Sequence, residues 1–394
     1  MTTAMTASET ALPQRLGVAV VGFGWMGRVH SQAYARLRHH FPDLGLVPDL
    51  VAVADEVPGR AEQAAAQFGF DTATRDWRAL LQDPRIDAVS ITTPNALHRE
   101  VGVAFAAAGK HLWIEKPVGL SVEDARAVRN AAAATGIQAT VGFNYRNAPA
   151  VQAARTLIST GALGDLTHAR IRFFSDYAAH PDGALTWRYE RAQGGNGVLG
   201  DLGSHAVDLA RHLLGEMDSL VADTAVFIPT RPRSSAATAG HALASGGEPG
   251  PVENDDYLSC LVRFTSGAHG VIEVSRVSVA EQNSYGFTIH GTKGMVSWDF
   301  RRMGELRVSR GEDYQDQPTS TVHVGPGAGD YAAFQPGAGN SMGYDDLKII
   351  EARDFLASIA AGAPQGATLD DAVHSAIALD AVARSVKSGS WTGL

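Results

Sequence analysis

LGVAVVGFGWMGRVHSQAYARLR, residues 16–38, is the stretch that decides the fold. A short apolar run leads into six residues that contain three glycines, and the apolar residues after them recur at helical spacing. This order predicts a strand, a tight glycine turn and a helix. In such a unit the first glycine permits the turn, the second lets backbone approach a pyrophosphate, and the third lets helix and strand pack closely. We therefore predict a dinucleotide site at Gly22, Phe23, Gly24, Trp25, Met26 and Gly27.

A second apolar strand, residues 50–54, ends at Asp55, where a carboxylate can accept hydrogen bonds from ribose hydroxyls. Because a carboxylate would repel a 2′-phosphate, the sequence predicts NAD rather than NADP. The spacing from Gly27 to Asp55 exceeds that usual for this motif, and we assign the excess to an extended loop around residues 39–48. The alternative for the whole unit is a glycine turn in a parallel sheet that binds no ligand.

The composition limits the classes of protein that the chain can be. Its 394 residues suffice for two domains, and the net charge of -9 disfavours nonspecific nucleic-acid binding. A single cysteine, Cys260, allows no disulfide within the chain, which fits a reducing compartment. Residues 1–15 look like a disordered tail without a signal peptide, and no apolar run approaches membrane-spanning length. We expect a cytoplasmic protein without a nucleic-acid or membrane partner.

Strands and helices alternate through the first half of the chain, which predicts a parallel sheet with right-handed crossovers. Ligands bind beyond the carboxyl ends of such strands. Three predicted strands end in polar or special residues: Thr93-Pro94-Asn95, Glu115-Lys116-Pro117 and Asn144-Tyr145-Arg146. Lys116 could also be an ordinary solvated loop lysine, but its place at a strand end favours a role in a site.

After residue 147 the pattern changes to alternation with a period of two, which predicts a large antiparallel sheet. Two segments rich in Gly, Pro, Ser and Ala, residues 229–253 and 311–343, are interpreted as long loops that are either mobile or folded over the site. The chain ends in two predicted helices, at residues 345–361 and 369–386.

The chemistry is expected in residues 194–214, where glycines precede an amphipathic helix. Asp201 and His205 are four residues apart and therefore share a side of that helix. Oxidation of a secondary alcohol needs a base for the hydroxyl proton, and histidine has a pKa near working pH. The alternatives are that Asp201 only caps the helix, that His205 is an ordinary buried histidine, and that both join Asp208 and His212 in a metal-binding stripe.

Five motifs together resemble the Gfo/Idh/MocA family of glucose-fructose oxidoreductases and inositol dehydrogenases. They are GFGWMG at 22–27, TPNALH at 93–98, EKP at 115–117, GFNYR at 142–146 and GDLGSHAVDLARHLLG at 200–215. The resemblance implies an α/β fold with a Rossmann domain, residues 16–146, and a substrate domain, residues 147–394, whose open sheet forms oligomers. It also implies that Lys116, Asp201 and His205 are the catalytic set. Within the family, the chain looks most like levoglucosan and glucoside 3-dehydrogenases.

The sequence thus predicts NAD-dependent oxidation of a ring hydroxyl of a sugar, glycoside or cyclitol, with His205 as base and Lys116 stabilising the oxyanion. The alternatives are glycoside cleavage with the cofactor recycled in each turnover, and a noncatalytic NAD-sensing module. No metal is predicted. Besides the glycine turn, the expected cofactor-binding residues are Asp55, Thr93, Pro94, Asn95, His98, Glu115, Lys116 and Asn144. The expected substrate-binding residues are Lys116, Tyr145, Arg146, Trp187, Arg188, Asp201 and His205, of which Trp187 and Arg188 could equally be interface residues.

Overall fold

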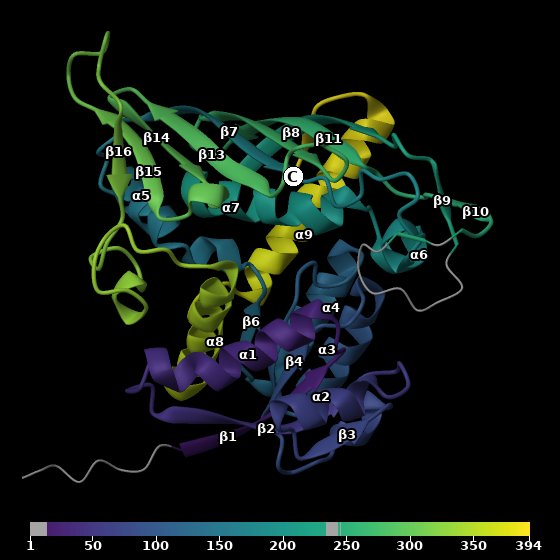
Figure 1. Cartoon of the computed structure of the whole chain (residues 1–394). Coiled ribbons are helices and arrows are strands. Elements are labelled where there is room, and N and C mark those ends of the chain that lie inside the picture. The colour runs from purple at the N-terminus through teal and green to yellow at the C-terminus, as the bar shows by residue number, and fades with distance from the viewer. Residues whose placement is uncertain (1–13, 234–242, 245) are drawn as a thin grey trace, which may run out of the picture.

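The computed structural model describes residues 14–233, 243–244 and 246–394, and it places two sheets one above the other with helices between and around them (Figure 1). Most of the predicted N-terminal tail, and part of the segment 229–253, lie outside the described residues. No helix within the described part of the chain is long and apolar enough to cross a membrane.

The N-terminal sheet has six strands in the order β3-β2-β1-β4-β5-β6, and every neighbouring pair is parallel. This confirms the predicted parallel sheet, and the strand order reverses between β1 and β4. The strands are β1 (Gln14–Val21), β2 (Leu46–Ala54), β3 (Thr72–Thr74), β4 (Ala88–Ile91), β5 (His111–Ile114) and β6 (Ala139–Val141). The helices are α1 (Trp25–His40), α2 (Arg60–Phe68), α3 (His98–Ala107) and α4 (Val122–Thr135). Ser121 starts α4 as its N-cap, accepting a hydrogen bond from the Asp124 N–H at 3.1 Å.

The predicted loop around residues 39–48 is not present. Helix α1 continues to His40 and β2 begins at Leu46, so the connection is only residues 41–45. The long spacing between Gly27 and Asp55 therefore comes from a 16-residue helix and a nine-residue strand. Three basic residues in the last turn of α1 interact favourably with its carboxyl end, which helps to extend the helix.

The C-terminal sheet has nine strands in the order β16-β15-β14-β13-β7-β12-β11-β8-β17. All neighbouring pairs are antiparallel except β12 with β7, which confirms a mostly antiparallel sheet. The strands are β7 (Leu166–Phe174), β8 (Met217–Ala225), β11 (Tyr257–Phe264), β12 (His269–Ser275), β13 (Ser284–Gly291), β14 (Gly294–Asp299), β15 (Glu305–Arg310), β16 (Ser320–His323) and β17 (Thr392–Gly393).

The two segments predicted as long loops contain some regular structure. Residues 311–343 include β16 and a short helical turn, Tyr331–Ala333. The described part of 229–253 includes β9 (Thr230–Pro232) and β10 (Pro249–Pro251), which form a separate antiparallel pair.

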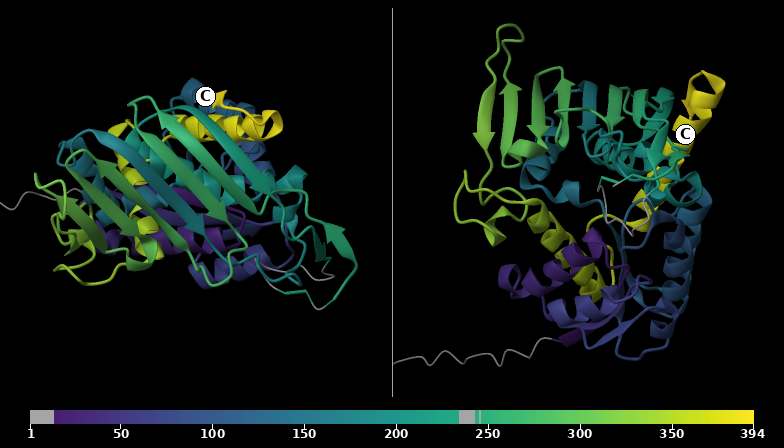
Figure 2. Two further views of the ribbon diagram at one scale, coloured as in Figure 1. Left: turned by 90° about the horizontal axis from the view of Figure 1, so that it is seen from above. Right: turned by 45° about the vertical axis from the view of Figure 1, so that its right-hand side comes forward.

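One face of the large sheet packs on helices α5 (Pro149–Ser159) and α7 (Ser204–Leu214). Along β7, Ala169, Ile171 and Phe173 are buried in this layer, whereas His168 and Arg170 point to the opposite face. In the left view of Figure 2 the strands lie in front and the helices behind, so the face of the sheet toward the viewer is not covered by any helix of the described residues.

The last two helices tie the halves of the chain together. Helix α8 (Tyr344–Ala361) packs Ile349 and Phe355 against Trp113 of the N-terminal sheet. Helix α9 (Leu369–Ser388) contributes Leu369 to the core beside β6. Helix α8 lies beside α1 on a face of the Rossmann sheet, and α9 runs from that sheet toward the large one, so segments from both ends of the chain pack together (Figure 1).

Candidate active site

The glycine turn is shaped for close approach of an anion. Gly22 has a φ of +87°, and a Cβ there would lie 2.8 Å from the backbone of Thr92. A Cβ on Gly27 would lie 2.5 Å from the Gly22 carbonyl oxygen, whereas one on Gly24 would meet nothing within 4 Å. The first turn of α1 has no acidic residue and no side-chain cap, so its N–H groups are available to phosphate. The three glycines thus differ in what each provides.

Asp55 is held beside this turn at the end of β2. Its Oδ2 accepts a hydrogen bond from the Phe23 N–H at 2.6 Å, and its Oδ1 accepts one from the Val57 N–H at 2.9 Å. The Arg60 guanidinium lies 3.3 Å from the same carboxylate. The side chain is 5% exposed, which places a buried negative charge next to the turn.

Two buried polar side chains at the carboxyl edge of the sheet have no hydrogen-bond partner among the described residues. They are Thr93 Oγ1, after β4, and both the nitrogen and the oxygen of the Asn144 amide, after β6. Asn144 is fully buried. An unpaired buried polar group costs about 1–3 kcal/mol, so a ligand that satisfies both groups gains that energy on binding. Together with the open space at Gly24, this fits a dinucleotide with its polar nicotinamide end at Asn144.

Lys116 and Asp201 meet although they are 85 residues apart. The Lys116 Nζ donates to the Asp201 carbonyl oxygen at 2.8 Å and to its Oδ1 at 3.0 Å, and the Tyr177 hydroxyl donates to its Oδ2 at 2.6 Å. Burial by itself raises the pKa of Asp201, but Lys116, Tyr177 and Arg188 together hold that pKa well below its ordinary value. The Asp201 side chain is still 39% exposed, so the carboxylate is both ionised and open to a ligand.

Asp201 lies in a wide helical turn, Leu199–Gly203, that directly precedes α7. Wide turns of this kind are frequent at functional sites. Its N–H donates to the carbonyl oxygen of Gly197, where a Cβ would lie 2.6 Å from the Asp255 carbonyl oxygen. The residue at the N-cap of α7 is Gly203. The carboxylate of Asp201 therefore faces Lys116 and Tyr177 and does not cap the helix.

His205 is the second residue of α7 and is 8% exposed. Its ring lies edge-on to the Tyr145 ring, with 4.8 Å between centroids. Burial and then the nearby Lys116 charge lower the pKa of His205 well below its ordinary value. The imidazole is therefore neutral near pH 7 and can accept a proton. The structure thus brings Lys116, Asp201 and His205 together, and their assignment as the catalytic set stays a prediction.

Arg146 has a different environment from the one predicted. Its guanidinium forms a two-pronged ion pair with Asp208 and donates to Asp371 of α9 at 3.1 Å. These contacts join the turn after β6 to α7 and α9 and leave the side chain only 9% exposed. The interpretation of Arg146 as a substrate-binding residue is corrected accordingly, because its donors are committed within the protein.

Of the other predicted site residues, Trp187 and Arg188 lie on the side of Asp201, whereas His98 links two turns of the Rossmann sheet. Trp187 and Arg188 follow one another in a short turn, with the guanidinium 4.5 Å from the indole centroid, and the Arg188 charge reaches Asp201. His98 places its ring nitrogens 2.9 Å from the Thr93 carbonyl oxygen and 2.7 Å from the Pro117 carbonyl oxygen, so it holds the turns after β4 and β5.

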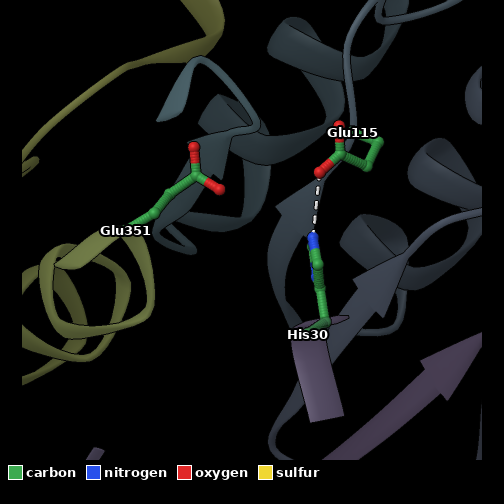
Figure 3. A group of neighbouring side chains, drawn as sticks. All are labelled: His30, Glu115 and Glu351. Carbon is green, nitrogen blue, oxygen red and sulfur yellow. Dashed lines mark hydrogen bonds and ion pairs between the residues drawn. The ribbon is translucent and has the colours of Figure 1, made fainter. Parts of the chain in front are cut away.

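The stripe of Asp201, His205, Asp208 and His212 does not converge on one point. Among the described residues, the group whose ligand atoms are close enough to hold a metal ion is His30, Glu115 and Glu351. Figure 3 shows these three side chains pointing toward a shared space from three different elements. The Lys348 Nζ binds both carboxylates, at 2.5 Å from Glu115 and 2.7 Å from Glu351.

Two residues near the site, Tyr177 and Tyr344, are not among the predicted catalytic, cofactor-binding or substrate-binding residues. Tyr177 follows β7 and binds Asp201, and Tyr344 begins α8 and stacks on Trp25 with 5.3 Å between ring centroids. Trp25 is 66% exposed, and the Tyr344 ring also lies 6.0 Å from that of Tyr145. Residue spacing in the sequence could not have identified either tyrosine, because each one contacts a residue far away in the chain.

Comparison with known proteins places both halves of the chain. Residues 16–143 match the family model described as "Oxidoreductase family, NAD-binding Rossmann fold", and residues 151–297 match the "GFO/IDH/MocA C-terminal domain". A levoglucosan dehydrogenase from Pseudarthrobacter phenanthrenivorans is 37% identical over 96% of this chain and 98% of the relative. An inositol 2-dehydrogenase from Rhizobium meliloti is 28% identical over 93% and 96%.

Solved structures give the same result. A levoglucosan dehydrogenase in complex with NADH and L-sorbose has a TM-score of 0.91 at 36% identity, covering 96% of this chain and 99% of that one. The complex of a levoglucosan dehydrogenase with NADH and levoglucosan has a TM-score of 0.90 at 35% identity, with the same coverage. The cofactor is NAD, as predicted. With both of its parts matched and a curated relative aligned along nearly its whole length, the chain belongs to the Gfo/Idh/MocA family of NAD-dependent oxidoreductases.

Proposed function

We propose that the chain oxidises a secondary ring hydroxyl of a sugar, glycoside or cyclitol to the ketone. The observation that carries the proposal is the contact between Lys116 and Asp201 in the immediate neighbourhood of the neutral His205. Relatives at 37% and 28% identity carry the names of levoglucosan and inositol dehydrogenases, both of which act on ring polyols.

The three side chains divide the work of the reaction. A secondary alcohol releases hydride only as its proton departs, so a neutral imidazole at His205 serves as the acceptor of the hydroxyl proton. The Lys116 ammonium, donating hydrogen bonds at this point, stabilises the developing oxyanion. Asp201 orients Lys116 and offers its exposed carboxylate to the substrate. When bound, NAD supplies the acceptor for the hydride.

We assign the remaining residues on the same basis. The glycine turn and Asp55 hold the adenosine and pyrophosphate half of NAD, and Thr93, Asn95 and Asn144 line the nicotinamide half. Tyr145, Trp187 and Arg188 line the substrate side, where an indole can stack on the apolar face of a sugar ring. Glu115 and His98 do not face the substrate in this assignment; they hold the strand ends in place through contacts with His30 and the Pro117 carbonyl oxygen.

A spectrophotometric panel tests this proposal. Purified protein with NAD is given monosaccharides, levoglucosan, other glycosides and inositols, and NADH is followed by its absorbance. We expect net NADH with at least one ring polyol, and the ketone as product. Release of an aglycone without net NADH would instead indicate glycoside cleavage, and NAD binding without turnover on the whole panel would indicate a sensing module; the comparisons support neither alternative.

We also infer a homo-oligomer that forms through the uncovered face of the large sheet. One row across this face is basic, with Arg263, His269, His168 and His290 in register on neighbouring strands. A second row, four residues further along the strands, carries Asp223, Glu273, Arg172 and Asp299 and is mainly acidic. Between them lies a middle row that is apolar at Val221, Leu261 and Val271 and continues with Arg170 on β7, and Leu261 is 49% exposed.

This order is self-complementary. A two-fold axis along this middle row places the row with Arg263 and the histidines of one copy against the mainly acidic row of the other, which is the arrangement that an isologous dimer requires. We expect light scattering to give a dimer or tetramer, Leu261→Arg to give the monomer, and Glu273→Arg to restore association that Arg263→Glu weakens. A wild-type monomer at micromolar concentration would refute the interface. We place the protein in the cytoplasm, where its buried Cys260 stays a thiol.

A further inference from the structure

A buried charged cluster lies directly behind the candidate active site. It consists of His30 from α1, Glu115 from the end of β5, and Lys348 and Glu351 from α8 (Figure 3 draws the first two and the last). All four side chains are at least nine-tenths buried. They join α1, which follows the glycine turn, the end of β5, which precedes Lys116, and helix α8. Three elements that must be aligned for catalysis therefore meet at one set of charges.

The contacts within the cluster centre on the Lys348 ammonium. It donates to Glu115 Oε1 and to Glu351 Oε2, while His30 Nε2 lies 2.9 Å from the same Glu115 oxygen. The Trp113 indole N–H donates to Glu351 Oε2 at 2.9 Å. The His30 ring stacks on Trp113 with 3.5 Å between centroids. Each member thus has at least two partners, which limits the positions that the ammonium can take.

The arrangement is that of a divalent metal site with an ammonium in place of the ion. The ligand atoms of His30, Glu115 and Glu351 lie within 4.8 Å of one another, and imidazole nitrogen and carboxylate oxygen are both ligands of divalent metals such as zinc. The Lys348 Nζ lies between the two carboxylates. A lysine occupies a similar place to a cation but cannot dissociate, so the cluster is permanently filled.

Glu115 transmits this constraint to the site. It immediately precedes Lys116, and its carboxylate is packed so closely against residue 142 that a Cβ there would lie 2.5 Å from Oε2. Gly142 is therefore required for the carboxylate to fit. The backbone around Glu115 is also held. The Glu115 N–H donates to the Ile91 carbonyl oxygen on one side, and the Gly142 N–H donates to the Ile114 carbonyl oxygen on the other. With side chain and backbone of Glu115 both held, the backbone from which Lys116 extends to Asp201 is fixed in place.

We propose that Lys348 is a positioning residue for the candidate active site, an internal cation that occupies a latent metal site and holds the Glu115–Lys116 turn in register with helices α1 and α8. The proposal rests on the proposed function for its effect on turnover. It does not rest on it for the metal-like geometry. His30 Nδ1 lies 3.1 Å from Ser90 Oγ, which holds the ring with Nε2 directed at the Glu115 carboxylate and so at the position of the ammonium.

The experiment removes the ammonium and offers a real ion in its place. The test variant is Lys348→Ala, and the matched control is Lys387→Ala, an exposed helical lysine near the end of α9. Each protein is checked for folding by circular dichroism and for NAD binding by fluorescence. It is then titrated with Co²⁺, whose visible absorption reports coordination by protein ligands.

We expect Lys348→Ala to bind one Co²⁺ and the wild type and Lys387→Ala to bind none at the same concentration. Adding His30→Ala to the variant should abolish the Co²⁺ spectrum, because it removes one of the three ligands. Turnover of Lys348→Ala should fall about 10-fold or more in kcat with a smaller change in the KM for NAD, and Zn²⁺ or Co²⁺ should restore part of it. A merely structural lysine would not be replaced by a metal ion.

Either of two results would overturn the proposal: wild-type kcat in Lys348→Ala, or Co²⁺ binding that does not need His30. If Lys348→Ala does not fold, Glu115→Gln and Glu351→Gln replace it as the test. The proposal requires that Glu115→Gln lowers kcat at least about five times more than Glu351→Gln does. Equal losses would refute it. A wild type without turnover on any polyol would refute the proposed function alone, since the Co²⁺ spectrum is measured without substrate.

Discussion

Replacing Tyr177 by phenylalanine removes one defined interaction, the hydroxyl that donates to Asp201 Oδ2 at 2.6 Å. The ring is kept, so packing after β7 changes little. A hydrogen bond to a charged group contributes about 1.5–3 kcal/mol when fully buried. The Asp201 side chain is 39% exposed, so solvent screening reduces this to about 1 kcal/mol.

That loss has two measurable consequences. The pKa of Asp201, which Lys116 and Tyr177 hold below its ordinary value against the effect of burial, rises toward that value. If the carboxylate orients Lys116 and substrate, kcat/KM falls about fivefold. Because a lowered pKa contributes stability that is present above the unfolded pKa and lost as pH falls through the folded one, the variant is less stable at pH 7 and the difference shrinks below about pH 4.

The assay follows NADH formation at pH 7 and thermal unfolding between about pH 2 and pH 8, which covers the range in which Asp201 titrates. Tyr257→Phe is the matched control, because the Tyr257 hydroxyl donates to Glu273 at 2.8 Å on the uncovered face of the sheet, away from the site. We expect only Tyr177→Phe to lose kcat/KM and to show a loss of thermal stability at pH 7 that shrinks below about pH 4. If the two variants have the same kcat/KM and the same dependence of thermal stability on pH, Tyr177 does not position Asp201.

Four further predictions test other parts of the site. His205→Ala should keep NAD binding, measured by calorimetry, and lose about 10²- to 10⁴-fold in turnover, and unchanged turnover would exclude His205 as the base. Because burial and Lys116 lower the pKa of His205, kcat/KM of the wild type should stay level through pH 6.5. Asp55→Ala should reduce the preference for NAD over NADP in kcat/KM, and an unaltered ratio would contradict its contact with the ribose. Asn144→Ala should weaken NAD binding about 10-fold in a fluorescence titration while leaving the protein without NAD as stable or more stable, because its amide has no protein partner among the described residues. Arg146→Met should lower the free energy of unfolding by about 3–5 kcal/mol in urea, since it leaves the buried Asp208 unpaired; a loss below about 1 kcal/mol would show that the pair is not structural.

Local signals in the sequence were enough to predict most of the fold. Alternating apolar residues identified β7 and β11 with their buried faces, and three glycines with a following helix identified the turn at Gly22. The wrong loop at residues 39–48 shows the limit of this reasoning, because helix length depends on packing against α8, which lies some 300 residues later.

The candidate site was predictable where residue type and position at a strand end coincide, as for Lys116 and Asn144. It was not predictable where a partner comes from a distant segment. Arg146 lies at a strand end like Lys116, and only its contacts with Asp208 and Asp371 show that its charge is used for structure. Tyr177 has no motif of its own, and its role emerges from one contact across 24 residues.

The return of α8 and α9 to the first sheet has a consequence for biosynthesis. A nascent chain that has emerged only as far as residue 146 lacks Phe355 and Leu369, which cover apolar side chains of its own strands. At a translation rate of about 5–20 residues per second, those helices follow roughly 10–50 s later. The nucleotide-binding half therefore cannot reach its mature packing while the ribosome is still decoding the middle of the message, and its exposed strands must be shielded until synthesis is nearly complete.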